Sequence, residues 1–333
     1  ATEFRAALAI RARRLGADHP TTSLTLQDLA GAEDRLGHYA DAERDWKRAI
    51  AIDKKAFGTA HHSITTSLNG LGQMLFKVGR LEEADSMLRE ALAINRQLFG
   101  ENHEAVAANL GNLAIVVRER GDFDEAERLL EEGLAIDQKL DGPEDYNVGF
   151  DLNEIAVVLR LRGKPDSAVK LLRRALAMTV KETGEDEVGT KIIRVNLGRA
   201  LLEARQYGEA EMLLRGALAK LDTNNADEQM GIVPGRIGLG RVLTATHRAR
   251  EAEPVLESAV AMGRARSGAE YWRTGEAEVA LAECLMDLGK LDSAEAPLRH
   301  GTEVLSKQRK AHPGLAADAD TANVRYAAMR RAR

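Results

Sequence analysis

The sequence predicts an all-α solenoid, a row of about seven similar helical hairpins. Three observations predict this fold. The chain repeats itself every 42 residues, each repeat contains two apolar stripes with helical spacing, and only seven prolines interrupt 333 residues. A unit of two helices cannot bury its apolar face alone, so neighbouring units must stack to form a continuous core.

The period is clearest in a column of alanines that recur at steps of 42 residues. The column comprises Ala42, Ala84, Ala126, Ala168, Ala210, Ala252 and Ala294. An acidic residue follows the alanine in six of the seven repeats, and an alanine or glycine lies seven positions after it in all of them. Five positions before the alanine a glycine occurs in five repeats, whereas Arg205 and His247 take its place in the fifth and sixth.

Each repeat contains two helices, which we call helix A and helix B. In the second repeat, helix A has apolar or small residues at i, i+3, i+4 and i+7, which is one face of an α-helix. The turn glycine is suited to end it, and a second apolar stripe then begins helix B. The two stripes comprise Leu68, Leu71, Gly72 and Leu75, then Leu81, Ala84, Leu88 and Ala91. The small residues Gly72 and Ala84 allow the two helices to pack closely.

These residues resemble the tetratricopeptide repeat. The usual period of that repeat is 34 residues, and the 42-residue period with the loop tag Asp18-His19-Pro20 is similar to the kinesin-light-chain type. The resemblance covers essentially the whole chain. It implies a right-handed superhelix whose A helices line the concave face, and it implies protein or peptide partners, although such repeats bind many unrelated ones.

The repeat spacing sets the expected boundaries. Seven complete repeats are expected over residues 21–309, as a single solenoid. Residues 1–15 match the later part of a helix B, so we expect a partial repeat there and infer that the sequence is a segment of a longer chain. Residues 314–330 are expected to form a closing helix that covers the last open face with Val324, Ala327 and Ala328.

One joint is expected to be weak. Four glycines lie between residues 231 and 240, next to Pro234. Each glycine in a helix costs roughly 1 kcal/mol relative to alanine. We therefore expect helix A of the sixth repeat to form a looser or bent joint.

Composition argues against several functional classes. The net charge of −5 disfavours a non-specific nucleic-acid binder, which needs a basic surface. No stretch approaches the roughly 20 apolar residues of a membrane span, so no membrane association is expected. The single cysteine, Cys284, rules out an internal disulfide and a thiol-rich metal site.

Motifs for catalysis, cofactors or metals are weak. No glycine-rich loop ends in Gly-Lys-Ser or Gly-Lys-Thr, and the glycines near 238 do not fit a dinucleotide fingerprint. His61 and His103 lie one whole repeat apart, so they are expected in neighbouring loops rather than in one metal site. Cys284 is expected to be a small buried residue rather than a nucleophile. We expect no enzyme, no cofactor, no metal and no catalytic residue.

The candidate site is a groove along the A helices. With the first core leucine of each helix A (Leu68 in the second repeat) as position 4, core positions 4, 7, 8 and 11 share one side. Positions 2, 5, 6, 9 and 12 then face away from the core, at 100° per residue. The predicted groove residues are Asn69, Gln73, Asn112, Ile115, Arg118, Phe150, Asn153, Val157, Arg160, Ile192, Asn196 and Arg199, and Val195 is expected beside them.

Their chemistry suggests the kind of partner. Side-chain amides can hydrogen-bond the N–H and C=O groups of an extended peptide, and arginines can form forked bonds to carboxylates. Exposed apolar side chains favour a binding surface. We therefore hypothesise a groove for a linear motif with an apolar anchor and acidic neighbours. In the alternative interpretation, the apolar residues simply pack against the adjacent helix A.

Several functions are compatible with the sequence. The leading hypothesis is a non-catalytic protein-interaction module that binds short peptide motifs of partner proteins. The second is a regulatory or sensor segment of a larger signalling protein, carrying a kinase or a nucleotide-binding switch. The third is a self-associating scaffold. One cysteine and the absence of a signal segment suit the cytoplasm.

Overall fold

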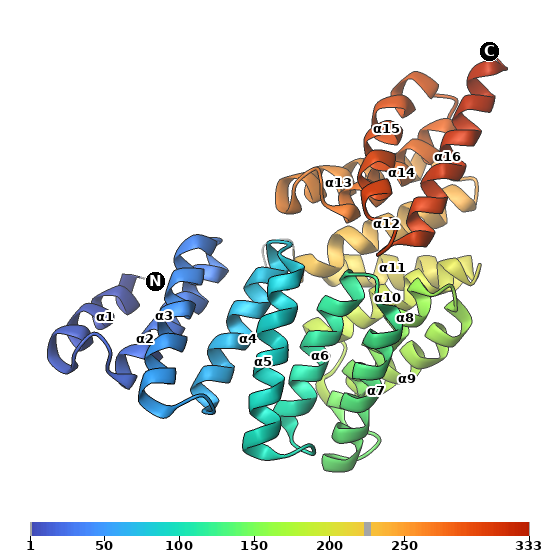
Figure 1. Ribbon diagram of the computed structural model, residues 1–333. Helices are drawn as coiled ribbons and strands as arrows, with labels where there is room; N and C mark the ends of the chain where they lie inside the picture. The colour runs from blue at the N-terminus through green and yellow to red at the C-terminus, as the bar shows by residue number, and fades with distance from the viewer. Residues whose placement is uncertain (1, 223–227, 333) are drawn as a thin grey trace. The chain divides into compact units, whose positions relative to one another are not determined.

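The computed structural model describes residues 2–222 and 228–332, and within these ranges the chain is all-α, as predicted (Figure 1). Sixteen helices follow one another in the described residues, with no strand among them. Helix α1 (Thr2–Leu15) comes first, seven A/B pairs follow, and α16 (Pro313–Arg331) comes last. The A helices are α2, α4, α6, α8, α10, α12 and α14.

The helical pairs keep the 42-residue period. The first three pairs are α2 (Pro20–Arg35) with α3 (Tyr39–Phe57), α4 (His62–Lys77) with α5 (Leu81–Phe99), and α6 (Glu104–Glu119) with α7 (Phe123–Leu140). The other four are α8 (Tyr146–Leu161) with α9 (Pro165–Thr183), α10 (Val188–Glu203) with α11 (Tyr207–Lys220), α12 (Gln229–Ala245) with α13 (Ala249–Ser267), and α14 (Trp272–Asp287) with α15 (Leu291–Lys307).

Small residues set the close packing within each pair. All seven alanines of the 42-residue column are 0% exposed. A Cβ atom added at Gly72 would lie 2.8 Å from Cγ of Leu88, and one added at Gly240 would lie 2.4 Å from Cγ of Leu256. These separations are too short for two carbon atoms. A leucine side chain of helix B therefore packs directly against the glycine of helix A in these repeats, and the small residues allow close packing as the sequence predicts.

Left-handed backbone conformations recur every 21 residues, at the ends of both kinds of helix. The series is Gly16, Gly37, Gly58, Gly79, Gly100, Gly121, Gly142, Gly163, Gly184, Arg205, His247, Gly268 and Gly289. The next position of this 21-residue series after Arg205 is residue 226, which lies outside the described residues. Arg205 has φ 60° and His247 has φ 61°, so both keep the turn although they carry side chains. Such a conformation costs an L-residue roughly 1–2 kcal/mol.

The histidine column has a structural role at helix N-termini. His19, His61 and His103 each accept a hydrogen bond at Nδ1 from the backbone N–H two residues later, at 3.1–3.2 Å. Asp145 takes this role at the same column in the fourth repeat. These side chains satisfy N–H groups that lack a partner within the helix. The histidines therefore cap the N-termini of three A helices and form part of the repeat pattern.

The chain divides into two compact units, Ala1–Pro143 and Glu144–Arg333. The first unit contains α1 to α7, and the second contains α8 to α16. In the first unit, Leu8 of α1 packs against the cluster of Leu26, Ala49 and Ile52. Helix α1 therefore occupies the place of a helix B beside α2. The organisation as one solenoid over residues 1–333 stays a prediction.

Two local expectations need correction. Val324 of the closing helix is 72% exposed and Ala328 is also exposed, so they do not cover the preceding hairpin. The covering side chains are Ala316, Ala319 and Ala322, each 1% exposed. These alanines recur every third residue on the opposite side of α16, and small side chains allow it to lie close to its neighbours.

The glycine-rich joint is also more closely packed than expected. Gly231, Gly235, Gly238 and Gly240 are all buried in α12, which is continuous over its 17 residues. A Cβ at Gly238 would lie 3.1 Å from Cγ of Arg199, on α10. The glycines therefore accommodate neighbouring helices at short range, and they do not leave the joint loose.

Candidate functional site

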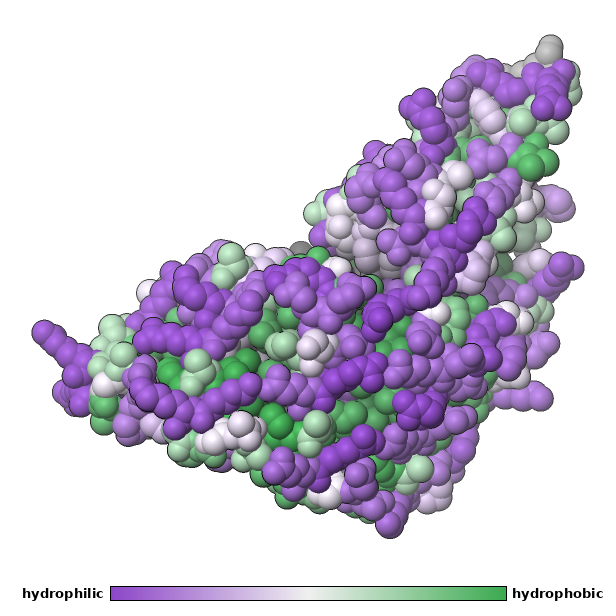
Figure 2. Space-filling model, viewed as in Figure 1, coloured by the Kyte–Doolittle hydropathy of each residue, from purple (hydrophilic) through white to green (hydrophobic). Residues whose placement is uncertain are grey.

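The predicted groove positions lie on one side of each A helix, which we call the A face (positions 2, 5, 6, 9 and 12). In the first unit the A face is open to solvent along α4 and α6, apart from buried Arg118 at position 12. Gln73 is exposed, and Asn69, Asn112 and Ile115 are half-buried. A Cβ added at Gly111 would meet no atom within 4 Å. The first unit thus presents amide and apolar side chains with space in front of them, and Figure 2 shows a mixture of hydrophilic and apolar side chains on its visible surface.

Several asparagine amides bond to one another. In the first unit, Asn95 donates to Asn109, and Asn109 donates to Asn69. In the second unit, Nδ2 of Asn196 donates to Oδ1 of Asn153 at 2.9 Å. The sequence analysis missed Asn95 and Asn109. Asn69 and Asn109 are 40 residues apart, and Asn153 and Asn196 are 43 residues apart. Both separations are close to the repeat length of 42, and this was a signal that could have revealed the bonded asparagines.

Two apolar groove candidates of the second unit, Phe150 and Val195, are engaged in packing. Phe150 is half-buried, and its ring is 4.5 Å from that of Tyr146 in an edge-on contact. A Cβ at Gly189 would lie 2.4 Å from the Phe150 ring, so this ring rests on the first turn of α10. Val157 and Ile192 are half-buried. Val195 is only 1% exposed, which corrects the expectation that it faces a groove.

The three predicted arginines are buried and paired with carboxylates. Arg118 is 8% exposed, and its Nη2 lies 3.5 Å from Glu119. Arg160 is 9% exposed and donates from Nη1 to Glu203 at 2.6 Å. Because each guanidinium already has an acidic neighbour, a carboxylate of a partner would have to compete with it.

Arg199 forms a buried ion pair that bridges two repeats. It is 5% exposed, and its Nη2 donates to Oε1 of Glu276 at 2.7 Å. Glu276, on α14, is 2% exposed. Arg241 donates to Asp318 of α16 with the same sequence separation, 77 residues. Arg199 of α10 thus reaches position 2 of α14, and Arg241 of α12 reaches the corresponding position of the closing helix α16.

The surrounding charges shift the pKa values of this pair. Burial and the nearby guanidinium groups lower the pKa of Arg199 to about 10, although Glu276 opposes the shift. Burial by itself would raise the pKa of Glu276. The positive charges of Arg199, Arg241 and Arg273 outweigh burial and lower that pKa to about 2. Glu276 is thus held as an anion in a cationic environment.

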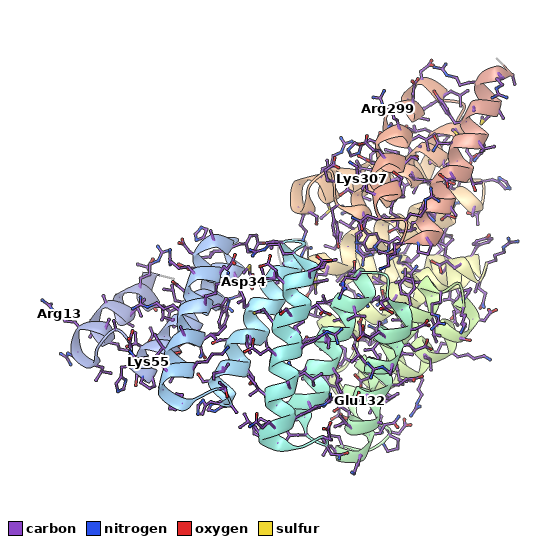
Figure 3. The ribbon with its side chains drawn as sticks, in the orientation of Figure 1. Arg13, Asp34, Lys55, Glu132, Arg299 and Lys307 are labelled. Atoms are coloured by element: carbon purple, nitrogen blue, oxygen red, sulfur yellow. The ribbon has the colours of Figure 1, made fainter. Side chains whose placement is uncertain are left out.

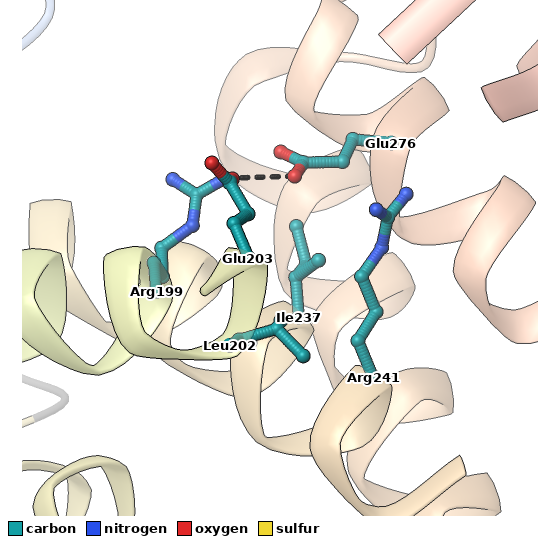
Figure 4. A pocket seen from close by; sticks show the side chains of 7 residues that line it. Arg199, Leu202, Glu203, Ile237, Arg241 and Glu276 are labelled. Carbon is teal, nitrogen blue, oxygen red and sulfur yellow. Dashed lines mark hydrogen bonds and ion pairs between the residues drawn. The ribbon is translucent and has the colours of Figure 1, made fainter. Parts of the chain in front are cut away.

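A cavity of about 200 Å³ lies beside this ion pair (Figure 4). It is lined by residues of α10, α12 and α14, which are Arg199, Leu202, Glu203, Ile237, Gly238, Arg241 and Glu276. Gly238 allows the stem of Arg199 to lie close to α12, since a Cβ atom there would be 3.1 Å from Cγ of Arg199. The sequence analysis found Arg199 and missed its partner Glu276, because it compared columns within adjacent repeats only.

Other candidate chemistry is structural. Cys284 is 0% exposed, its Sγ donates to the carbonyl oxygen of Ala249 at 3.1 Å, and burial raises the pKa of its thiol to about 11. A thiol with such a pKa is a poor nucleophile. Over the described residues, no group of three His, Cys, Asp or Glu side chains is placed to hold a metal ion. No helix in the described part of the chain is both long and apolar enough to cross a membrane.

Comparison with known proteins gives a family and several structural neighbours. Models of the tetratricopeptide repeat match residues 22–63, 63–139 and 151–222. No curated protein matches the chain. A candidate kinesin light chain of Podosopora anserina with nearly identical TPR-like repeats is 25% identical, with a TM-score of 0.52 over 61% of this chain and 95% of that one.

Two further structures share the fold at lower identity. The apo form of RapI is 13% identical, with a TM-score of 0.65 over 86% of this chain and 99% of RapI. A Rap protein complexed with Competence and Sporulation Factor is 14% identical, with a TM-score of 0.55 over 94% and 98% of the two chains. These two similarities concern the fold alone.

Proposed function

Because the chain belongs to the tetratricopeptide repeat family, whose fold serves as a protein–protein interaction module, we propose that its open A face binds a short segment of a partner protein. The proposed partner segment is extended, carries an apolar anchor and has acidic neighbours. Members of this family are typically non-catalytic, and the proposal gives the chain no catalytic role.

The single observation that carries the proposal is the open A face of the first unit. Gln73 and Asn112 offer amide donors and acceptors, which suit the N–H and C=O groups of an extended backbone. Half-buried Ile115 lies one helical turn from Asn112 and offers an apolar contact. Open space at Gly111 leaves room for a bound chain. A Rap protein of the same fold is complexed with Competence and Sporulation Factor, so this fold is compatible with a bound factor.

The predicted groove residues of the second unit are less available to a partner than those of the first. Asn153, Asn196 and Arg199 already bond to other side chains. We assign them a supporting role, in which a partner's acidic residues contact this part of the chain only by displacing an internal carboxylate.

A peptide-display selection tests the proposal. The wild-type chain is compared with a Gln73→Ala/Asn112→Ala/Ile115→Ala variant of equal helicity. The matched control is Gln97→Ala/Leu98→Ala/Asn102→Ala, which likewise truncates a glutamine, an asparagine and a branched aliphatic residue, at exposed sites. We expect enrichment of motifs with a bulky apolar residue by the wild type and the control, and its loss in the A-face variant. Equal enrichment by all three proteins would contradict the proposal.

A further inference from the structure

One edge of the first unit carries a row of exposed apolar side chains. They lie at the C-terminal ends of the helices α1, α3, α5 and α7, all of which occupy the place of a helix B. The row, which we call the apolar edge, comprises Leu15, Phe57, Leu98, Phe99 and Leu140, each 38–48% exposed.

The apolar edge passes from one repeat to the next. The ends of α3, α5 and α7 follow one another along the lower border of the first unit in Figure 1. Nζ of Lys55, on α3, donates to Asp18 in the loop after α1 at 2.8 Å. Nζ of Lys139, on α7, donates to Asn102 in the loop after α5 at 3.1 Å. Each of these helix ends therefore lies beside the loop of the preceding repeat.

The described residues of the second unit contain no counterpart of the apolar edge. In the first repeat the two columns that supply it hold Ala56 and Phe57. In the second unit the described residues at these columns are Glu182, Thr183, Arg266, Ser267, Gln308 and Arg309. Hairpins thus form without apolar residues at these columns. Neighbouring exposed apolar side chains that the fold does not need indicate an interaction surface.

The two phenylalanines of the apolar edge are held in place. Phe57 stacks on His61 with 4.0 Å between the ring centroids, and Phe99 stacks on His103 with 4.3 Å. One side of each ring thus rests on a histidine that caps the next helix, and the side chains are still 43% and 42% exposed. A side chain that is already fixed loses little entropy when a partner covers it.

Charged side chains change sign along the apolar edge. At the α1 end, Arg13 and Arg14 are exposed and form no ion pair with the described residues (Figure 3). Toward the α7 end, Glu104 and Asp141 are exposed and likewise form no ion pair within the described ranges. Lys139 offsets one of these two acidic charges. The edge therefore runs from basic at α1 to acidic at α7.

We propose that two copies of this chain pair through their apolar edges, antiparallel to each other about a two-fold axis. Such an axis brings the same surface to both sides, so that each residue meets its counterpart's neighbour in a reciprocal way. Arg13 and Arg14 of each copy then face Glu104 and Asp141 of the other, and the phenylalanines meet near the centre. A parallel arrangement places like charges opposite one another, which is unfavourable.

The pairing is separate from the proposed peptide-binding surface. The apolar edge consists of the ends of helices of the B type, whereas the A face consists of outward positions on A helices. A pair of chains presents two open A faces, so a partner with two motifs should bind it more tightly than a partner with one. Failure of the pairing leaves the proposed peptide binding untouched.

Sedimentation velocity of the whole chain over a range of concentrations tests the pairing. We expect the wild type to exchange between monomer and dimer with a micromolar dissociation constant, because the interface is small. Phe57→Ser/Phe99→Ser should weaken dimerisation at least about tenfold, since it removes apolar area that the dimer buries. Leu36→Ser/Val78→Ser is the matched control and should have no effect, because these side chains are 59% and 37% exposed at the ends of A helices.

Charge reversal tests the antiparallel arrangement without changing an apolar residue. One variant is Arg13→Glu/Arg14→Glu, and the other is Glu104→Lys/Asp141→Lys. Each variant alone should dimerise at least about tenfold more weakly than the wild type, because like charges then meet at both ends of the interface. An equimolar mixture of the two variants should recover dimers, since opposite charges meet again at both ends.

Four results would overturn the inference. The wild type could stay monomeric at every concentration, its dimers could withstand the serine and charge variants alike, or the mixture could dimerise no better than each charge variant alone. In the fourth, a monomeric wild type sediments with vesicles of anionic phospholipid and Phe57→Ser/Phe99→Ser does not, which would assign the apolar edge to a lipid surface. If the serine variant does not fold, the two charge variants and their mixture decide.

Discussion

The A faces of the two units are built from the same repeat positions, and they differ most at positions 9 and 2, where the second unit forms a buried ion pair. In the first unit, position 9 carries exposed Gln73 and half-buried Ile115. In the second unit, position 9 carries Arg199, which is 5% exposed and bonded across one intervening repeat to Glu276. The A helices of the second unit also contact one another more extensively than those of the first. The buried ion pair between positions 9 and 2 thus distinguishes the second unit from the more open A face of α4 and α6.

The largest expected difference between the two faces follows removal of the Arg199 side chain. Arg199→Ala removes the hydrogen-bonded partner of the buried Glu276 carboxylate, which should destabilise the second unit by about 3–5 kcal/mol. Gln73→Ala, at the equivalent exposed position of the first unit, should change the free energy of unfolding by no more than about 0.5 kcal/mol. Denaturant unfolding can be followed in each unit separately, because Trp46 belongs to the first and Trp272 to the second.

A double variant serves as the control for this experiment. Arg199→Met/Glu276→Leu removes both charges and keeps apolar volume, so it should recover most of the stability that Arg199→Ala loses. If Arg199→Ala and Gln73→Ala lowered the free energy of unfolding equally, the ion pair would not be what stabilises the A face of the second unit.

Acid should weaken the second unit through Glu276. Its pKa in the folded chain is lowered to about 2, below the ordinary value for a glutamate, so the unfolded chain takes up a proton first as the pH falls. The stabilisation from this group is therefore complete above the ordinary pKa and is lost as the pH falls toward 2. In pH-dependent unfolding followed by Trp272, wild type and Glu276→Gln should converge on acidification. Curves that stay parallel would contradict this assignment.

Close helix packing should matter in both units, with a larger effect in the second. A Cβ at Gly240 would lie 2.4 Å from Leu256, and one at Gly72 would lie 2.8 Å from Leu88. Overpacking of this kind costs about 1–3 kcal/mol, partly offset by the better helix propensity of alanine. Thermal unfolding should therefore rank Gly240→Ala as more destabilising than Gly72→Ala. The reverse order would mean that the neighbouring leucines relax differently from the geometry described here.

The smallest expected effect concerns the turns that lack glycine. Arg205 holds φ 60° in a turn where the first unit uses glycine, and Gln206 N–H bonds to the carbonyl of Leu201 at 2.8 Å. Arg205→Gly removes the strain of a left-handed L-residue and should raise stability by about 1 kcal/mol. Gly121→Ala, at the same turn of the third repeat, should lower it by a similar amount. Equal melting temperatures for wild type and Arg205→Gly would argue that this turn is unstrained.

Sequence reasoning predicted the fold well because the repeat is a local pattern. The alanine column and the turn glycines recur at fixed steps, and each constrains only its own hairpin and the next. The closing face of α16 was misjudged, because apolar side chains such as Val324 suggested burial whereas the close contact uses Ala316, Ala319 and Ala322. Small residues leave no strong hydrophobic signal, and only the neighbouring helix shows which face they cover.

Sequence predicted those parts of the candidate site that follow from the geometry of a single helix. Helical geometry identified Gln73 and Ile115 as outward-facing positions. The same rule placed Arg199 on the A face, but it could not reveal that Glu276, 77 residues later, reaches it. That contact requires the glycine at 238 and the close approach of three A helices. Long-range packing of this kind lies beyond a periodicity argument.

The most direct test of the contrast between the faces is hydrogen exchange of the chain with and without a peptide obtained by display selection. If the open face of the first unit is the binding surface, added peptide should slow exchange across α4 and α6 and leave α10, α12 and α14 unchanged. Protection confined to α10, α12 and α14, with none on α4 or α6, would contradict the account.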